Sequence, residues 1–371
     1  GENIQQNDNF QTEYILQPTE ETVAQITYIP VEPASAAAIV NSDSFVDKTA
    51  DQNNFDLPCK AALLMDESTG QILYAKNADQ QLPIASITKV MTMLLVFEAL
   101  DSGKIKLQDT VPITAHAYSM GGSQIWLEPG EVFTVHELLK AVAVASANDA
   151  AVALAEFVGG SESVFCDMMN TRAKELGMEN TNFMNTNGLH DENHYTSARD
   201  MALIGAAAFQ HEDFRKITGT YQHVIPETNI TAEKRYVHQN HKMLRDWDSR
   251  YYEYCVGGKT GYTDQALSTL VTFATKEDVN LVAVVLKTHG GGNNTYVDTR
   301  AMLDFAFDNF AKVPVTKDMI GEENIAKLEK ETLEPDFYND IKNSQKVLQK
   351  IKEFTNKIDR FKSLQTDWED M

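Results

Sequence analysis

The sequence predicts an α+β fold in which strands from the two ends of one large domain form a single antiparallel sheet. The stretch AALLMDESTGQILYAK (61–76) has the pattern of two strands joined by a turn that ends at Gly70. The β-rich runs 266–275 and 280–288, separated by a short charged segment, have the pattern of a second hairpin. Because the segments between these hairpins have helical patterns, we expect the strands of both to pair in one sheet.

Helical patterns fill the middle of the chain. The apolar run 86–100 predicts a buried helix that stops near Gly103. The Ala-rich stretch 134–160 predicts two helical pieces that meet near Ser146 and end at a pair of glycines. The patterns over 161–177 and 299–310 predict two further helices.

Composition divides the chain into three regions. Residues 1–56 are polar with short apolar stretches and predict an extended leader or linker, which can add an edge strand. Residues 57–311 form the α+β domain, and residues 312–371 predict a helical C-terminal extension. Apolar residues recur in this extension at steps of three and four: Val347, Leu348, Ile351, Phe354, Ile358, Phe361, Leu364 and Trp368. Packing of that helix on its own domain and packing on a partner helix both stay open.

The charge balance excludes one class of partner. The chain of 371 residues has 32 basic and 54 acidic residues, a net charge of −22, so we expect no nucleic-acid partner.

Three scattered cysteines, Cys59, Cys166 and Cys255, predict buried or free thiols rather than a disulfide framework. The sequence has no apolar run of membrane-spanning length. It begins with Gly, and we expect that a signal peptide has been removed.

Ser86 and Lys89 are polar residues at the start of the apolar run PIASITKVMTMLL. Three positions apart on a helix, they share one face, so the lysine amine can reach the serine hydroxyl. A serine needs a base to become a nucleophile, and a lysine serves when burial, a helix N-terminus or a second cation lowers its pKa. The alternative is that Ser86 caps a helix, and a chain of this length contains about one S-x-x-K by chance.

Ser146 and Asn148 stand in an apolar stretch at the predicted helix junction. A hydroxyl and an amide two positions apart could project into one cleft, with Ser146 relaying a proton between Lys89 and a leaving group and Asn148 holding a substrate amide. Capping of a helix by Ser146 is the structural alternative.

Lys259, Thr260 and Gly261 lie in the stretch GGKTGYT, ahead of a β-rich run. The glycines predict a strand that another group approaches closely. Lys259 and Thr260 would supply a cation and a hydroxyl to a substrate carboxylate, and Lys259 would also lower the pKa of Lys89. An ordinary glycine-rich turn is the alternative, but K-T-G is expected only about a tenth of a time by chance.

The order S-x-x-K, S-x-N, K-T-G resembles that of the penicillin-recognising serine enzymes. The stretches 61–95, TNFMNTNGLH (181–190), YTSARDMALI (195–204) and GGKTGYTDQA (257–266) are similar to the D-alanyl-D-alanine carboxypeptidases among the low-molecular-mass penicillin-binding proteins. The resemblance covers roughly residues 59–310. It implies a β-lactamase/transpeptidase-like fold, with helices flanking the sheet, a mainly helical subdomain and the active site between them.

The resemblance also implies a role for each motif residue. Ser86 would attack the carbonyl between the two terminal D-alanines of a peptidoglycan stem peptide, with Lys89 as the base. Ser146 would pass a proton to the departing D-alanine, and Asn148 would orient the peptide.

The K-T-G strand would bind the end of the substrate. Lys259 and Thr260 would hold the terminal carboxylate, and Gly261 would allow the close approach. The backbone N–H groups of Ser86 and Tyr262 would form the oxyanion hole.

Partners and location follow from the same resemblance. It implies a peptidoglycan stem peptide as substrate, β-lactams as acylating inhibitors, no cofactor and an extracytoplasmic location. Many relatives carry a β-sandwich and an amphipathic anchor after the catalytic domain, whereas about sixty helix-like residues follow here. We therefore expect any peripheral membrane association to use a segment outside this sequence, and self-association to use the C-terminal helix.

His190, His194, His238 and His241 match no metal motif, and we expect them to be polar loop residues.

Two alternative functions share these motifs. A serine β-lactamase of class A needs a glutamate that activates the deacylating water, but no ExxLN pattern is present. A sensor or scaffold that is acylated by penicillin without turning over peptide is favoured only by the C-terminal helix.

Overall fold

The computed structural model describes residues 25–30, 57–277, 279–289 and 292–315, and isolated helical positions at 328, 330, 332, 344, 347, 348, 351, 352 and 355. The chain divides into two compact units. One unit is Tyr28–Lys312, which contains the sheet and helices described below. The other combines Gly1–Thr27 with Val313–Met371, and most of its residues lie outside the described ones. The predicted limits of leader, domain and extension stay predictions.

A five-stranded antiparallel sheet in the order β3-β2-β10-β9-β8 is the centre of the larger unit. The first hairpin and the last hairpin share this sheet, as predicted, because β2 pairs with β10 in a register that places Leu63 opposite Val284. The strands are β2 (Cys59–Asp66), β3 (Ile72–Lys76), β8 (Cys255–Thr263), β9 (Leu267–Lys276) and β10 (Val279–Thr288).

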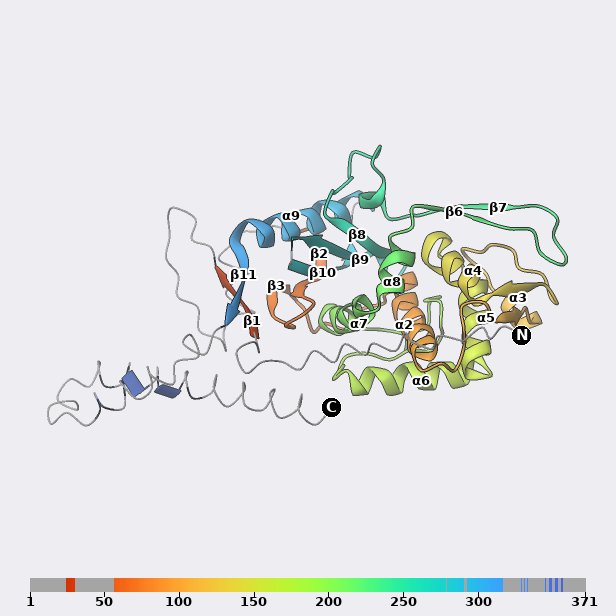
Figure 1. Cartoon of the computed structure of the whole chain (residues 1–371). Coiled ribbons are helices and arrows are strands. Elements are labelled where there is room, and N and C mark those ends of the chain that lie inside the picture. Colours follow the sequence, from red (N-terminus) through yellow and green to blue (C-terminus); the bar gives the residue numbers. More distant parts are fainter. Residues whose placement is uncertain are drawn as a thin grey trace, which may run out of the picture. The chain divides into compact units, whose positions relative to one another are not determined.

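Helices cover both faces of the sheet (Figure 1). Helix α9 (Asn293–Asn309) packs on one face with Met302 and Leu303, against alternate residues of the strands. Helix α7 (Ala198–Gln210) packs on the other face, against the remaining residues, such as Val282. Because both faces are buried, strands β2, β9 and β10 are buried along most of their length, without the alternation of a half-exposed sheet. Helix α9 begins six residues earlier than the predicted helix 299–310.

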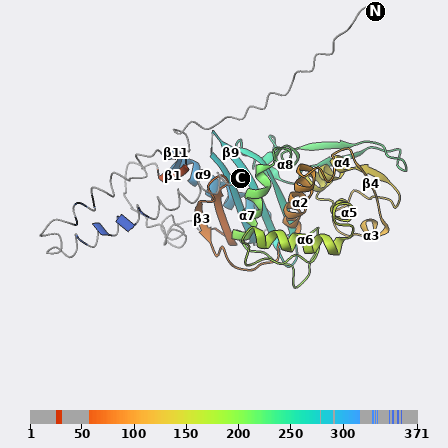
Figure 2. The same ribbon diagram turned by 60° about the horizontal axis from the view of Figure 1, so that its bottom comes forward.

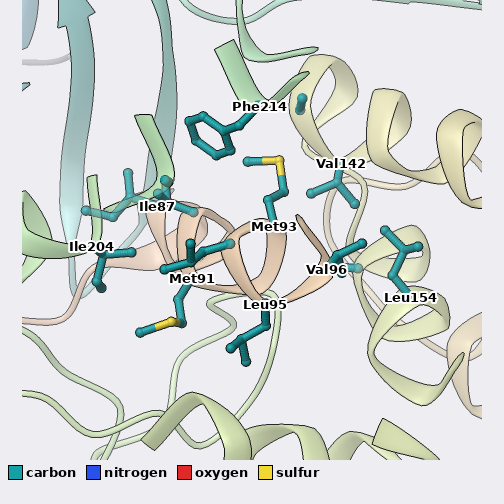
Figure 3. Packing of buried hydrophobic residues seen from close by; sticks show 14 of the residues in the cluster. Ile87, Met91, Met93, Leu95, Val96, Val142, Leu154, Ile204 and Phe214 are labelled. Atoms are coloured by element: carbon teal, nitrogen blue, oxygen red, sulfur yellow. The ribbon is translucent and has the colours of Figure 1, made fainter. Parts of the chain in front are cut away.

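Helix α2 (Lys89–Asp101) runs through the middle of the helical part, between the sheet and helices α4 (Val135–Lys140) and α5 (Asn148–Gly159) (Figures 1 and 2). Figure 3 shows its side chains packing in several directions, with Met91 towards Ile204 and Val96 towards Leu154. Every residue from Lys89 to Phe97 is buried. A helix that is enclosed on all sides has no polar face, which explains the apolar run in the sequence.

The predicted start of this helix and the predicted helix junction are both confirmed, with local changes. A 3₁₀ turn, Ala85–Thr88, precedes α2, so the predicted helix at 86–100 is α-helical only from Lys89. A π-helical turn, Ala141–Ala145, separates α4 from α5. The predicted helix at 161–177 is α6 (Glu162–Glu175).

Apart from the strand expected in the leader, the sequence patterns did not predict the smaller elements. Among the described residues, three two-stranded sheets lie outside the main one: β4 (Thr110–Pro112) with β5 (Val132–Thr134), β6 (Gln222–Ile225) with β7 (Arg235–His238), and β1 (Gln25–Pro30) with β11 (Phe310–Val315). The short helices are α3 (Ala115–Tyr118), α8 (Glu212–Thr218) and a 3₁₀ turn, Lys242–Leu244. The leader strand β1 thus pairs with β11 and adds no edge to the main sheet.

Few of the predicted terminal features fall on described residues. Val347, Leu348 and Ile351 are helical, whereas Phe354, Ile358, Phe361, Leu364 and Trp368 lie outside the described residues. Cys59, Cys166 and Cys255 are buried free thiols. Within the described part of the chain, no helix is both long and apolar enough to cross a membrane.

Two histidines, His194 and His241, lie in the interior instead of in exposed polar loops, with 3% and 0% of their surface exposed. Burial lowers the pKa of His194 to about 4 and that of His241 to about 3. The folded protein therefore keeps both rings neutral near pH 5, whereas the unfolded chain protonates them near pH 6.5. Their neutral state stabilises the fold fully above about pH 6.5, and this stabilisation is lost as the pH falls towards the folded-state pKa values.

We expect the free energy of unfolding to fall between pH 6.5 and pH 4, with a slope of about 1.4 kcal/mol per pH unit from each buried histidine. Urea unfolding at several pH values measures this slope. The substitution His241→Gln should make the slope shallower, while His238→Gln, at an exposed position, should leave it unchanged. Equal slopes for the wild type and His241→Gln would contradict the prediction.

Candidate active site

The amine of Lys89 is the centre of a compact polar cluster inside the apolar core. Its Nζ lies 2.9 Å from Ser86 Oγ, 2.6 Å from Asn148 Oδ1 and 2.6 Å from the carbonyl oxygen of Asn187. The side chain is fully buried. Three separate segments therefore meet on one nitrogen: the turn before α2, the start of α5 and the loop at 185–189.

Ser86 and Lys89 share one face, as their spacing predicts, because the 3₁₀ turn continues directly into α2. The alternative in which Ser86 caps a helix is wrong, since neither the turn nor α2 has a side-chain cap. The Oγ of Ser86 instead lies within hydrogen-bonding distance of the Lys89 amine.

Ser146 and Asn148 lie at the junction between the π-helical turn and α5. Ser146 has a left-handed backbone with a φ of 59°, and its Oγ accepts a hydrogen bond of 2.8 Å from Lys259 Nζ. Both ends of the Asn148 side-chain amide are hydrogen-bonded. Its Oδ1 accepts from Lys89 Nζ, and its Nδ2 donates to the Gly121 carbonyl at 2.7 Å. The capping alternative for Ser146 is also wrong, because Ala147 precedes α5 without a side-chain cap.

Lys259, Thr260 and Gly261 lie on the edge strand β8. The Lys259 amine is buried and donates to Ser146 Oγ and to the Thr260 carbonyl, each at 2.8 Å. A Cβ on Gly261 would lie 2.9 Å from the backbone nitrogen of Ser86, so only glycine allows this strand to pass so close to the serine. Tyr262 follows with 65% of its surface exposed.

The two lysines give the site its electrostatics. Burial, and then the charge of Lys259, hold the pKa of Lys89 well below its usual value, while the charge of Asp149 acts in the opposite direction. Burial lowers the pKa of Lys259 to about 7. Both amines therefore lose their proton more easily than an ordinary lysine, and the charge of Lys259 adds to this effect at Lys89. This is the electrostatic relation that the sequence predicted between the two residues.

The loop at 185–189 supplies contacts that sequence reasoning missed. The Asn187 carbonyl accepts a hydrogen bond from Lys89. A motif made of side-chain types does not indicate which backbone carbonyl makes such a contact. Gly188 has a φ of +86°, and a Cβ there would lie 1.9 Å from the Ala85 carbonyl oxygen. Asn185 Oδ1 accepts from the Gly188 N–H at 2.7 Å and closes the loop. The glycine in TNFMNTNGLH is the only sequence signal for this close packing.

Metal ligands are not grouped in the part of the chain that the structure describes. No three His, Cys, Asp or Glu side chains there converge on one point. His194 and His241 are hydrogen-bonded to threonine hydroxyls, at 2.7 Å and 2.9 Å.

Comparison with known proteins identifies the family. Residues 47–290 match the model of peptidase S11, D-alanyl-D-alanine carboxypeptidase. The chain is 45% identical over 262 residues to D-alanyl-D-alanine carboxypeptidase DacF of Bacillus subtilis (strain 168), covering 70% of this chain and 64% of the relative. It is 37% identical over 238 residues to DacC of Escherichia coli (strain K12), covering 61% and 56%. The chain thus spans less than two thirds of the length of these relatives.

Solved structures agree with the sequence relatives. Penicillin binding protein 5 of Haemophilus influenzae superposes with a TM-score of 0.62 at 34% identity, covering 68% of this chain and 72% of that protein. A peptidoglycan synthesis regulatory factor, PBP3 of Streptococcus pneumoniae, superposes with a TM-score of 0.62 at 32% identity and the same coverage. The predicted α+β fold class and the family resemblance are confirmed, and the chain belongs to the D-alanyl-D-alanine carboxypeptidase family, peptidase S11.

Proposed function

We propose that this chain is a serine-type D-Ala-D-Ala carboxypeptidase, a hydrolase that removes the terminal D-alanine from peptidoglycan stem pentapeptides through an acyl-enzyme. The observation that carries the proposal is the 2.9 Å contact between Ser86 Oγ and a buried lysine amine of lowered pKa. The family match and the names of the relatives support it.

Acylation begins with the neutral form of Lys89. Two N–H groups of this amine donate to Asn148 Oδ1 and to the Asn187 carbonyl, which leaves its lone pair for the Ser86 hydroxyl. Lys89 takes the serine proton as Ser86 Oγ attacks the carbonyl carbon between the two D-alanines. The N–H groups of Ser86 and Tyr262 stabilise the oxyanion of the tetrahedral intermediate.

Collapse of the intermediate needs a proton on the departing amine. Ser146 is suited to relay it: its Oγ accepts from Lys259, its hydrogen passes to the leaving nitrogen, and it takes up in exchange the proton that Lys89 removed from Ser86, so that Lys89 is neutral again. The C–N bond then breaks, D-alanine leaves and the Ser86 ester remains. Water, deprotonated by Lys89, hydrolyses this ester and releases the shortened peptide.

Substrate recognition uses the remaining motif residues. Lys259 and the Thr260 hydroxyl bind the terminal carboxylate, a charge-assisted contact of the kind that fixes orientation as well as affinity. Asn148 Nδ2, which donates to Gly121 here, orients the amide of the stem peptide. Gly261 keeps strand β8 close to Ser86.

The proposal extends to partners and location. A peptidoglycan substrate implies an extracytoplasmic protein whose signal peptide has been removed, and β-lactams acylate Ser86 as substrate mimics. We propose that peripheral membrane association, where it occurs, uses a segment beyond this sequence, and that the C-terminal helix mediates self-association.

The decisive experiment measures D-alanine released from a pentapeptide and from a cross-linked peptide by the wild type and by Ser86→Ala. The carboxypeptidase releases D-alanine from the pentapeptide, and the variant does not. Rapid hydrolysis of penicillin would instead identify a β-lactamase, whereas stable acylation without D-alanine release would identify a sensor. Cleavage of the cross-linked peptide would add endopeptidase activity.

Replacing Lys89 tests the general base. We expect Lys89→Ala and Lys89→Arg each to slow acylation by labelled penicillin about 100- to 10,000-fold, because an arginine keeps the charge but does not accept the serine proton. Lys140→Ala is the matched control, since burial also lowers the pKa of Lys140 but its amine donates to Thr220. Normal acylation in Lys89→Arg would reject Lys89 as the base.

Replacing Lys259 tests carboxylate recognition. We expect the wild type to prefer a free C-terminal carboxylate over its amide, and Lys259→Ala to reduce this preference about 10- to 100-fold through loss of a charge-assisted hydrogen bond. Losing the Lys259 charge also raises the pKa of Lys89, so the acid limb of the pH–rate profile should move to higher pH. Lys276→Ala, at the C-terminal end of the neighbouring strand β9, is the control. Equal hydrolysis of acid and amide by the wild type would refute the role.

A further inference from the structure

Ala85, the residue whose carbonyl shares a peptide group with the Ser86 N–H, has an unusual backbone conformation. Ala85 has a φ of +53°, a left-handed value that is costly for a residue with a Cβ. The N–H of this same peptide group belongs to Ser86 and is one of the two donors of the proposed oxyanion hole. Because a peptide group is planar, with its C=O and N–H pointing in opposite directions, whatever fixes the Ala85 carbonyl also fixes the direction of the Ser86 N–H.

Two neighbours hold the Ala85 carbonyl. Thr88 Oγ1 donates to it at 2.8 Å from one turn further along the chain. Gly188 packs its backbone against the same oxygen, so closely that a Cβ would lie at 1.9 Å. The carbonyl is therefore enclosed between the loop at 185–189 and the threonine hydroxyl.

His194 sets the direction of that hydroxyl. Its Nδ1 accepts a hydrogen bond of 3.1 Å from the Met184 N–H, so the ring hydrogen of the neutral imidazole is on Nε2. His194 Nε2 lies 2.7 Å from Thr88 Oγ1 and donates to it. The threonine must then point its own hydrogen elsewhere, and it points to the Ala85 carbonyl.

This chain of hydrogen bonds is rigid and uncharged. Thr88 is fully buried and His194 is 3% exposed. Phe183 packs edge-on against the imidazole at a centroid distance of 5.7 Å. The lowered pKa of His194 keeps the ring uncharged at neutral pH, and the hydrogen bond from the Met184 N–H fixes its tautomer.

We propose that His194 and Thr88 are positioning residues, which orient the Ala85–Ser86 peptide group so that the Ser86 N–H faces the oxyanion. This inference rests on the proposed function, since it assigns a role in the same acylation step. Neither residue touches the substrate, and both act through the backbone.

The test compares Thr88→Val, which removes the hydroxyl at nearly constant volume, with Thr88→Ser, which keeps it. The amplitude of acylation by a chromogenic β-lactam counts the folded enzyme, and its saturation kinetics separate the rate constant of acylation from the binding constant. We expect Thr88→Val to lower the rate constant about 10- to 100-fold with little change in binding, because an oxyanion donor acts in the transition state. Thr88→Ser should recover most of the rate.

Thr299→Val is the matched control. Thr299 is also fully buried and also donates to a backbone carbonyl one turn away, Thr295 O at 2.7 Å, but in helix α9. Its loss should lower the melting temperature to a similar extent and leave the acylation rate constant unchanged. Equal rate constants for Thr88→Val and the wild type, or equal losses in Thr88→Val and Thr299→Val, would overturn the inference. Absence of acylation in the wild type would instead overturn the proposed function.

A double-mutant cycle tests whether the two residues act as one unit, and its single variant His194→Phe serves alone if Thr88→Val does not fold. His194→Phe keeps a ring beside Phe183 but does not donate to Thr88. We expect it to lower the same rate constant, and the pair Thr88→Val/His194→Phe to be no slower than the slower single variant. A normal rate constant in His194→Phe, or fully additive losses, would refute the chain through His194.

Discussion

The burial of two lysine amines side by side is the constraint on which the rest of the structure depends. An ammonium loses much of its solvation in a protein interior, and a second positive charge increases the cost, so the amine that is easier to deprotonate becomes neutral. Lys89 and Lys259 meet this constraint without a directly bound carboxylate: their described hydrogen-bond partners are neutral oxygens of Ser86, Ser146, Asn148, Asn187 and Thr260. Supplying these oxygens requires the turn before α2, the junction before α5, the loop at 185–189 and strand β8 to converge. The enclosed helix α2 then keeps the Lys89 amine dry.

The features that depend on side-chain identity could be predicted from the sequence. Ser86 and Lys89 had to share a face because three residues separate them, and the apolar residues that follow indicated burial. The long strands of the sheet could be predicted because both of its faces are covered, which leaves continuous apolar runs. The helix junction at Ser146 was visible because polar residues interrupt an Ala-rich stretch, and the structure shows the reason: Ser146 turns into a left-handed conformation to reach Lys259.

The features that depend on backbone groups or on small buried areas could not be predicted. The Asn187 carbonyl has the same chemistry whatever side chain stands at 187, and the hydrogen bond it makes to Lys89 joins residues 98 positions apart. The strands of the β4–β5 and β6–β7 sheets have only three or four residues each, too few for an alternation of period 2 to be recognised in the sequence. Burial of His194 and His241 was missed for a related reason, since a histidine in a polar stretch is usually exposed and only the tertiary contacts with threonines reveal its role.

A histidine at position 194 is physically well suited to orient the Thr88 hydroxyl. A carboxylate could also orient a threonine hydroxyl, but its negative charge would raise the pKa of Lys89, as the charge of Asp149 already does. A protonated group would destabilise the two buried amines further. A neutral imidazole avoids both effects, because it offers one donor and one acceptor in fixed directions and adds no net charge. A related pair lies at His241, whose Nε2 bonds Thr272 and whose ring lies where a Cβ on Gly258, the residue before Lys259, would come within 2.6 Å, although the His241 Nδ1 has no hydrogen-bond partner among the described residues. The turn that carries Ser86 and the strand that carries Lys259 are thus each packed against a buried, uncharged His–Thr pair.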